Sequence, residues 1–332
     1  MTAQVHDTGT WRPASQVETA KRRAYMLLQA RDFFAARQVL EVDTPALSRT
    51  AASDPHIESL EVRLQLSRES PYYLQTSPEF CMKRLLCAGY PNIYQICKVF
   101  RDNEAGRRHQ PEFTMVEWYR LDFGLREIME DTIDFLSTLI EPRNLPRSPQ
   151  FLEYRDAFLQ FAGVDPLEAP VTRLAEACNA DGELTALLGD RRDDWLDLIL
   201  ASRIAPQLPA GRLTVLCHYP AEQAALARLC PDNASVADRF EVFLGERELA
   251  NGYVELRDAT EQSRRFENDQ AIRRTLERPV RSLDRRFIAA LQAGLPACAG
   301  VAVGFDRLLM INETTDDIRQ VQTFAFDESA SE

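Results

Sequence analysis

The sequence predicts an α+β protein in which β-hairpins alternate with helices along the chain. Two stretches, 98–119 and 239–256, read as pairs of strands joined by a polar loop or a tight turn. The stretches 15–39 and 124–141 are predicted helices, and residues 261–293 form a charged helical region. The chain also lacks the glycine patterns of Rossmann and P-loop nucleotide sites.

Composition excludes several classes of protein. The 332 residues are 45% apolar, which is enough for a sizeable core in one large domain or two small ones. No apolar run of about 18 residues predicts a membrane span, and the N-terminus has no signal-peptide pattern, so we expect a cytoplasmic protein. The seven scattered cysteines are expected to be reduced thiols rather than a zinc site. A net charge of −12 argues against a broad surface for nucleic-acid phosphates.

The first part of the chain should form a long helix and a short strand. Ser15 and Glu18 fit a capping box that opens a helix reaching about Val39. The strand that follows is broken by Pro45, and residues 59–66 alternate like another strand.

A second helix is predicted to begin at Ser77 as N-cap, with Pro78 in the first helical position and Gly89 at the end. Residues 150–210 look mostly helical and acidic, and we interpret them as an insertion packed on the sheet. The segment CAGVAVGFDRLLMI closes the fold, and residues 327–332 form a frayed acidic tail.

The 98–119 hairpin combines a cationic loop with a mixed strand. Its first strand ends at Arg101, and the loop carries Arg107, Arg108 and His109. Because side chains alternate along a strand, one face of the second strand carries Phe113, Glu117 and Tyr119 and the other carries Thr114, Val116 and Trp118. This wall suits a ligand with a flat base, an anionic centre and a cationic end. The alternative is a surface hairpin with solvated charges.

The 239–256 hairpin brings two carboxylates together. A two-residue turn at 245–246 would pair Glu241 with Ala250 and make Glu241 and Glu248 diagonal neighbours on one face. Two carboxylates this close repel unless a cation lies between them, and oxygen ligands with room for phosphates suit Mg²⁺. The alternative is an exposed strand pair with solvated charges.

Two further features lie near these carboxylates. Glu255 would face away from Glu248 in a regular strand, and a bulge at 251–252 would return it to the same face. Small residues in VAVGFDRLL let the backbone approach a ligand closely. Arg307 then falls in the first turn of the next helix, beside free backbone N–H groups that suit a phosphate or adenine.

Four segments carry a family resemblance. The stretch KVFRDNEAGRRHQPEFTMVEWY resembles motif 2 of class II aminoacyl-tRNA synthetases, in particular the lysyl branch, and AGVAVGFDRLLM is similar to the G-x-G-x-G-x-D-R pattern of motif 3. FFAARQVLEVDTPAL resembles motif 1, and RELANGYVEL stands in its expected place. The resemblance covers the chain from about residue 15 and implies a single catalytic domain, residues 1–332. It also implies an antiparallel sheet flanked by helices, dimerisation through motif 1, and activation of a carboxylate by ATP.

The resemblance implies an ATP site with two catalytic arginines. Arg101 would bridge the substrate carboxylate and the α-phosphate, while Phe113 and Arg307 would sandwich the adenine. His109 would reach the γ-phosphate. The implied ATP-binding set is Arg101, Asn103, Glu104, His109, Gln110, Phe113, Glu248, Leu249, Gly304 and Arg307, and Glu241 and Glu248 would hold Mg²⁺. No side-chain nucleophile is required.

The implied amino-acid pocket is acidic. Glu79 would take one ammonium group of the substrate, and Glu117 and Glu255 the distal one. Three carboxylates around one small site are costly without cations, so a diamino acid is expected. The implied pocket residues are Ser77, Glu79, Glu117, Tyr119, Asn251, Glu255 and Ala302.

Three positions depart from the family pattern. Asn103 stands where the family has glutamate and Glu104 follows it, so the adenine contact could come from either residue. Gln110 replaces the usual asparagine after the histidine, and Ala302 replaces the middle glycine of motif 3.

The short N-terminus selects a branch of the family. Lysyl-tRNA synthetases place an anticodon-binding domain before motif 1, whereas about 14 residues precede that helix here. The chain thus resembles the elongation factor P lysine ligases, which activate (R)-β-lysine and transfer it to a lysine of elongation factor P. The implied partners are that acceptor and a second copy of the chain, without a stable nucleic acid, and Arg107 and Arg108 could contribute to docking.

Two alternatives remain at this point. The chain could be a free-standing lysyl-tRNA synthetase-like enzyme that acts on tRNA or makes diadenosine polyphosphates, or a non-catalytic paralogue that senses an amino acid. A sensor need not keep the residues implied for triphosphate and magnesium, and these are intact. ATP–pyrophosphate exchange separates a catalyst from a sensor.

Overall fold

The computed structural model describes residues 12–65 and 67–326. Its core is an eight-stranded sheet of β1 (Leu40–Glu41), β5 (Ile93–Phe100), β6 (Glu112–Leu121), β13 (Cys298–Gly304), β12 (Arg247–Val254), β11 (Arg239–Leu244), β8 (Leu213–Cys217) and β7 (Gln150–Glu153), in that spatial order. Only the outermost pairs, β1 with β5 and β7 with β8, are parallel. The expected antiparallel sheet of an α+β fold is confirmed.

Smaller elements surround this sheet. A three-stranded sheet contains β2 (Leu47–Ser48), β4 (Ser67–Leu74) and β3 (Glu61–Leu64), and a two-stranded sheet contains β9 (Leu229–Cys230) and β10 (Asn233–Ala237). The α-helices are α1 (Val17–Ala36), α2 (Glu79–Cys87), α3 (Leu125–Leu139), α4 (Tyr154–Phe161), α5 (Val171–Ala177), α6 (Gly182–Leu188), α7 (Arg192–Ile199), α8 (Ala259–Thr275), α9 (Arg285–Gly294) and α10 (Phe305–Asn312). Short turns of 3₁₀- or π-helix are η1 (Pro142–Asn144), η2 (Leu200–Ile204), η3 (Ala205–Gln207), η4 (Ala221–Gln223) and η5 (Ile318–Val321). No helix within the described ranges is both long and apolar enough to cross a membrane.

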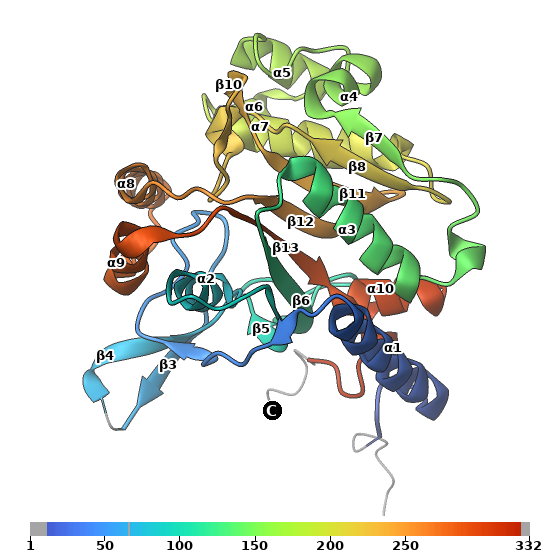
Figure 1. Ribbon diagram of the computed structural model, residues 1–332. Helices are drawn as coiled ribbons and strands as arrows, with labels where there is room; N and C mark the ends of the chain where they lie inside the picture. The colour runs from blue at the N-terminus through green and yellow to red at the C-terminus, as the bar shows by residue number, and fades with distance from the viewer. Residues whose placement is uncertain (1–11, 66, 327–332) are drawn as a thin grey trace, which may run out of the picture.

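One face of the sheet is covered by α1, α3 and α10 (Figure 1). The predicted alternation on β6 is confirmed, because Val116 and Trp118 belong to the core on this face. Phe34 of α1 completes that core by stacking on Tyr94, with ring centroids 4.1 Å apart. The side chains between these positions on β6 point to the opposite face, where the cavity lies.

Two groups of helices cover the opposite face and leave a gap between them. Helices α2, α8 and α9 pack together at one end of the sheet, and α4 to α7 lie at the other (Figure 1). The first group rests on Tyr119, and the second rests on Leu216 and Phe243. Between the two groups, side chains of the sheet line a cavity.

Two expectations about local structure need correction. Helix α1 begins after Gln16 with no side-chain cap, so the capping box is wrong; Glu18 instead pairs with Lys21 at 2.8 Å. The stretch 150–210 is mostly helical but opens with β7, which extends the main sheet. Four alternating residues are too short a signal to identify an edge strand from sequence. The predicted acidic tail, residues 327–332, lies outside the described residues.

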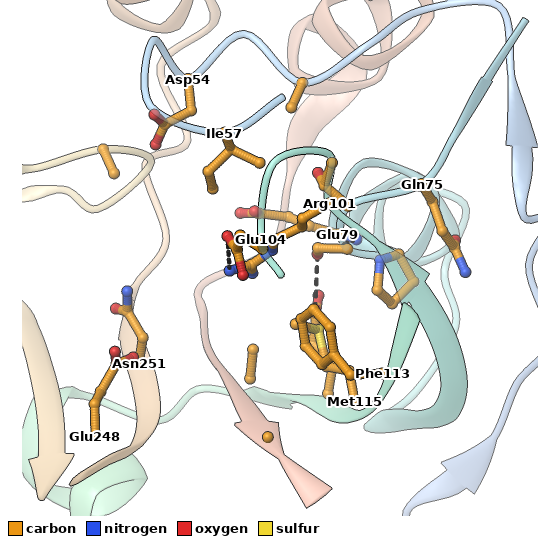
Figure 2. Close-up of a pocket in the computed structure, with 18 of the residues that line it drawn as sticks. Asp54, Ile57, Gln75, Glu79, Arg101, Glu104, Phe113, Met115, Glu248 and Asn251 are labelled. Atoms are coloured by element: carbon orange, nitrogen blue, oxygen red, sulfur yellow. Dashed lines mark hydrogen bonds and ion pairs between the residues drawn. The ribbon is translucent and has the colours of Figure 1, made fainter. Parts of the chain in front are cut away.

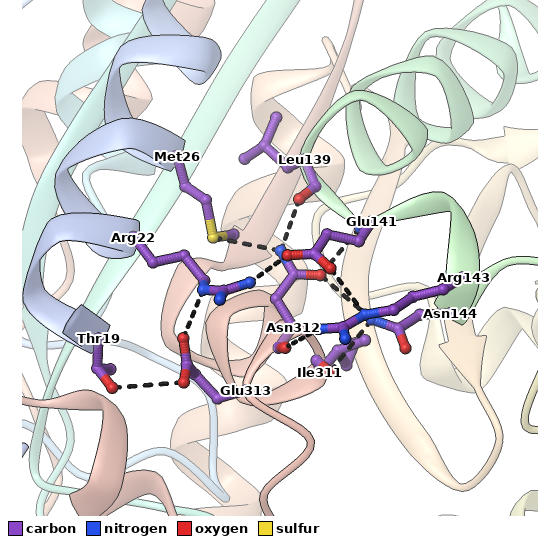
Figure 3. Close-up of polar contacts among 10 residues, drawn as sticks. All are labelled: Thr19, Arg22, Met26, Leu139, Glu141, Arg143, Asn144, Ile311, Asn312 and Glu313. Atoms are coloured by element: carbon purple, nitrogen blue, oxygen red, sulfur yellow. Dashed lines mark hydrogen bonds and ion pairs between the residues drawn. The ribbon is translucent and has the colours of Figure 1, made fainter. Parts of the chain in front are cut away.

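Buried Asn312 ties three helical segments together on the covered face (Figure 3). Its Nδ2 donates to the carbonyl oxygen of Leu139 at 2.8 Å, and its Oδ1 accepts from the backbone N–H of Glu141 at 2.9 Å. Arg22 of α1 pairs with Glu141 and, at 2.7 Å, with Glu313. These contacts hold α1 and the end of α3 against α10, the helix that carries Arg307.

Candidate active site

A cavity of about 810 Å³ opens between the two helix groups. Figure 2 shows Arg101 and Phe113 on one side of it and Glu248 and Asn251 on the other. The cavity is lined by all but one of the predicted site residues, namely Ser77, Glu79, Arg101, Glu104, His109, Gln110, Phe113, Glu117, Tyr119, Glu241, Glu248, Leu249, Asn251, Glu255, Ala302, Gly304 and Arg307. The exception, Asn103, is outside it.

Strand register aligns the floor of the cavity. On β13, Ala302 is paired with Glu117 of β6 on one side and with Asn251 of β12 on the other. Two residues earlier, Gly300 lies between Tyr119 and Tyr253. A Cβ atom at Gly300 would lie 2.5 Å from the Tyr119 ring and 2.6 Å from Oε1 of Glu255. The floor therefore requires glycine at this position.

The β11–β12 hairpin has the predicted two-residue turn at 245–246 but a different register beyond it. Glu241 pairs with Asn251 and not with Ala250, because Leu249 is an extra residue on β12. The predicted bulge is therefore present, but two residues earlier than expected. Leu249 is 1% exposed and belongs to the core cluster, so its burial accounts for the bulge.

Glu241 is held by a cation that sequence reasoning missed. Arg239 donates to its Oε1 at 2.6 Å, lies over the Tyr219 ring at 4.5 Å, and contacts Asn251 at 3.4 Å. Burial, and then the charge of Glu248, raises the pKa of Glu241 to about 7. The spacing of Arg239 and Glu241, two residues apart on one strand face, could have indicated this pair.

The loop end of the cavity carries the cations. The Arg101 guanidinium lies over the Phe113 ring at 5.2 Å, and Nη1 of Arg101 is 3.6 Å from Glu104. Arg307 donates to the carbonyl oxygen of Glu248 at 2.7 Å, and its Nη2 is 2.8 Å from Nε2 of His109. Burial and the Arg307 charge lower the pKa of His109, so Nε2 accepts from the guanidinium.

The residues of the loop between β5 and β6 make different contacts. Asn103 has a φ of 63° in the turn, which directs Glu104 rather than Asn103 to the cavity wall. Gln110 is buried and accepts from the backbone N–H of Phe326 at 2.8 Å. Arg108 pairs with Glu246 at 2.5 Å, which ties the loop to the β11–β12 turn.

Asp306 links the site to α1. One carboxylate oxygen accepts from the backbone N–H of Thr114 at 2.7 Å, and the other pairs with Arg23 at 2.5 Å. Arg23 also donates to the Thr114 hydroxyl at 2.6 Å. The three motif-bearing segments are thus joined by one buried carboxylate directly beside Arg307.

The opposite end of the cavity is acidic and buried. Glu117 accepts from the Ser77 hydroxyl at 2.8 Å and from the Tyr119 hydroxyl at 2.7 Å. Burial, followed by the charge of Glu79, raises the pKa of Glu117 to about 7. Burial also raises the pKa of Glu255 to about 8, although a nearby ammonium acts in the opposite direction.

That ammonium belongs to Lys83, which sequence reasoning missed. Its side chain is 1% exposed, and Nζ pairs with Glu255 and with Glu79 at 2.6 Å. The expectation that only a ligand would neutralise the three carboxylates is therefore incomplete, because the chain supplies one cation itself. Its spacing four residues after Glu79 on α2 was the available signal.

Comparisons with known proteins find relatives over nearly the whole chain. The family model for class II tRNA synthetases (D, K and N) matches residues 10–328. The elongation factor P–(R)-β-lysine ligase of Haemophilus influenzae strain PittGG is 40% identical over 330 residues, 98% of this chain and 99% of the relative. The ligases of Hamiltonella defensa and Klebsiella pneumoniae strain 342 are each 39% identical, covering 96% and 97% of this chain and 98% and 99% of their own lengths.

The chain belongs to the elongation factor P–(R)-β-lysine ligase family. This confirms the family resemblance. Class II synthetases use ATP. In this chain the cationic side chains lie at one end of the cavity and the carboxylates at the other, and strand β13 forms the floor between them. Such a cavity can hold a nucleotide and a cationic amino acid with the carboxylate of the amino acid between them.

Proposed function

We propose that the protein activates (R)-β-lysine with ATP and joins it to the ε-amino group of one lysine on elongation factor P. The observation that carries this proposal is the cavity itself, with Arg101 and Arg307 at one end and three carboxylates at the other, of which Glu117 and Glu255 are buried and Glu79 is half-buried. The near-full-length similarity to ligases of that name supports the choice of substrates.

The first step forms an adenylate. A carboxylate oxygen of β-lysine bonds to the α-phosphorus of ATP, and the bond to the departing pyrophosphate breaks. Arg101 neutralises the charge that develops on the α-phosphate, and Arg307 stacks on the adenine opposite Phe113. Neutral His109 accepts from Arg307 at Nε2, so its Nδ1–H is the group that can donate to an oxygen of the outer phosphates.

The second step transfers the acyl group. The unprotonated ε-amine of the acceptor lysine attacks the carbonyl carbon of the adenylate, AMP leaves with the bonding electron pair, and the nitrogen loses a proton. The mixed anhydride is already reactive, so orientation supplies most of the rate. The acidic end fixes both ammonium groups of β-lysine and thereby positions its carbonyl.

We also propose a Mg²⁺ site at Glu241 and Glu248. The two carboxylates lie on one face of the hairpin, and the charge of Glu248 contributes to the raised pKa of Glu241. That mutual repulsion fits an oxygen-ligated divalent cation, which would neutralise phosphate charge when bound.

A homodimer through α1, β1 and β2 is proposed as well. The apolar face of α1 that contains Phe33 and Phe34 is buried within the chain. A second set of large apolar side chains on these elements is exposed: Tyr25, Leu28, Leu40 and Leu47. They lie on neighbouring segments, and a second copy would cover them.

One experiment tests the reaction. ATP–pyrophosphate exchange is measured with (R)-β-lysine, (S)-β-lysine, α-lysine and no amino acid, and the mass of elongation factor P is measured after incubation with each. We expect the highest kcat/KM with (R)-β-lysine and a single β-lysyl mass increment on the factor. Exchange without transfer to the factor, but with charging of tRNA, would favour the synthetase alternative. No exchange with any amino acid would favour the sensor.

A further inference from the structure

Lys83 lies behind the amino-acid end of the cavity and does not line it. Its ammonium contacts Glu79 and Glu255, and it faces the rings of Tyr253 and Phe287 at 5.2 and 5.8 Å from their centroids. The opposing charges of Glu255 and Glu79 outweigh burial and raise the pKa of Lys83, so it stays charged at neutral pH.

Glu255 also points to a ligand. The residue is 1% exposed and lines the cavity. Its Oε1 makes no hydrogen bond to any residue in the described ranges, although Oε2 contacts Lys83. A buried carboxylate oxygen without a donor is costly, so a donor from the ligand is expected there.

The charges that face this end can be counted. The cluster contains three carboxylates and one ammonium. Burial raises the pKa of the tyrosine and cysteine side chains that interact with them, so these side chains are neutral at pH 7. These neutral groups are Tyr119, Tyr253, Cys87, Cys97 and Cys298. Arg257, the other cation whose field reaches Cys298, is exposed. With all carboxylates ionised, two negative charges remain for a ligand to match.

We propose that Lys83 is a positioning cation that sets the net charge of this pocket. The pocket thereby matches an amino acid with two ammonium groups, and binding of that amino acid releases protons from Glu117 and Glu255. The inference rests on the proposed function only for the identity of the diamine. Lys83 acts through Glu79 and Glu255, because it does not reach the cavity itself.

Proton release follows from the state of the empty pocket. With a pKa of about 8, Glu255 is mostly protonated at pH 7, and with a pKa of about 7, Glu117 is half protonated. The empty pocket therefore holds between about one and two protons. Two ligand ammonium groups favour the ionised carboxylates, so affinity should rise with pH between 6 and 8 by about tenfold or more per pH unit at the lower end.

The first test uses the wild-type protein alone. Calorimetric titration at pH 7 in buffers of different ionisation enthalpy counts the protons released by (R)-β-lysine, by α-lysine and by the monoamines 6-aminohexanoic acid and (R)-3-aminohexanoic acid. We expect between one and two protons for a diamine and fewer for either monoamine. A diamine that binds with the same enthalpy in all buffers would overturn the inference.

The second test separates charge from packing. Lys83→Met leaves three carboxylates for two ligand charges, so we expect affinity at pH 7 to fall at least tenfold and the midpoint of its pH dependence to rise. The double variant Lys83→Met, Glu255→Gln again has two net negative charges in the pocket. It should recover part of the affinity and lower the midpoint of the pH dependence. Lys98→Met, which removes an exposed lysine paired with Glu112, is the matched control and should change neither.

The outcomes remain distinguishable from those of the proposed function. If Lys83 only stabilises α2, folded variants will keep the wild-type midpoint and the double variant will not recover affinity, which refutes the inference. If β-lysine is not the substrate, α-lysine will still release protons and the inference will stand while the proposed function fails. If neither diamine binds, both are refuted.

Discussion

Gly300→Ala should weaken amino-acid binding far more than its single methyl group suggests. The added Cβ would lie 2.5 Å from the Tyr119 ring and 2.6 Å from Oε1 of Glu255, and both side chains are buried. Neither neighbour is the free end of a flexible surface chain, so the floor strand or the carboxylate must shift. Overpacking of this kind costs about 1–3 kcal/mol, which is roughly a 5- to 150-fold loss in affinity.

The assay is ATP–pyrophosphate exchange over a range of β-lysine concentrations. We expect KM for the amino acid to rise within that range while KM for ATP changes little, because the nucleotide contacts lie at the other end of the cavity. Gly182→Ala is the control, since a Cβ there meets nothing within 4 Å. Wild-type KM for β-lysine in Gly300→Ala would refute the tight floor, and equal losses for both substrates would indicate general misfolding.

Four further outcomes are expected. Arg101→Ala should raise the activation free energy of adenylate formation by about 2.7–4 kcal/mol, measured by pyrophosphate exchange, without lowering the melting temperature. Ala302→Gly should reduce the preference for β-lysine over α-lysine, chiefly by improving kcat/KM for α-lysine. The methyl group is expected to contribute about 1–3 kcal/mol to this discrimination. An unaltered ratio of the two kcat/KM values in exchange assays would mean that other residues determine the preference. Burial raises the pKa of Glu117 and Glu255 from 4.5 to about 7 and 8, so their contribution to stability is present below pH 4.5 and is lost as pH rises through 7 to 8. The melting temperature of the free protein should therefore fall between pH 5 and 8.5 and that of the diamine complex should fall less, whereas parallel curves would contradict the pKa values. Leu28→Arg should yield monomers in light scattering at micromolar concentration, and a wild-type monomer would refute the dimer.

The fold, and the sheet face on which the site lies, could be predicted from patterns within short stretches of sequence. Strand alternation placed Glu117 and Tyr119 on the cavity side, and the two-residue turn brought Glu241 near Glu248. Both depend on periodicity within a few residues, which tertiary packing preserved here.

The remaining features depend on contacts between distant segments. The position of the bulge at Leu249 depends on packing of that side chain in the core of the folded chain. The sequence pattern at 251–252 predicted the bulge two residues too late. Lys83 was visible as a helix neighbour of Glu79, but its second partner is 172 positions further along the chain and no spacing rule connects them. Glu104 lines the cavity and Asn103 does not, and the positive φ of Asn103 behind this difference had no signal in the sequence.

The ion pairing of Lys83 bears on how the enzyme avoids modifying itself. An acyl-adenylate reacts with any free amine, yet only three of the 39 basic residues are lysines, and all three are paired with carboxylates: Lys21 with Glu18, Lys83 with Glu79 and Glu255, and Lys98 with Glu112. A protonated amine has no lone pair with which to attack a carbonyl. Lys83 also does not line the cavity, whereas both of its carboxylate partners do. Because Glu255 and Glu79 raise the pKa of Lys83, its amine is a poor competitor for an activated amino acid held in the neighbouring cavity.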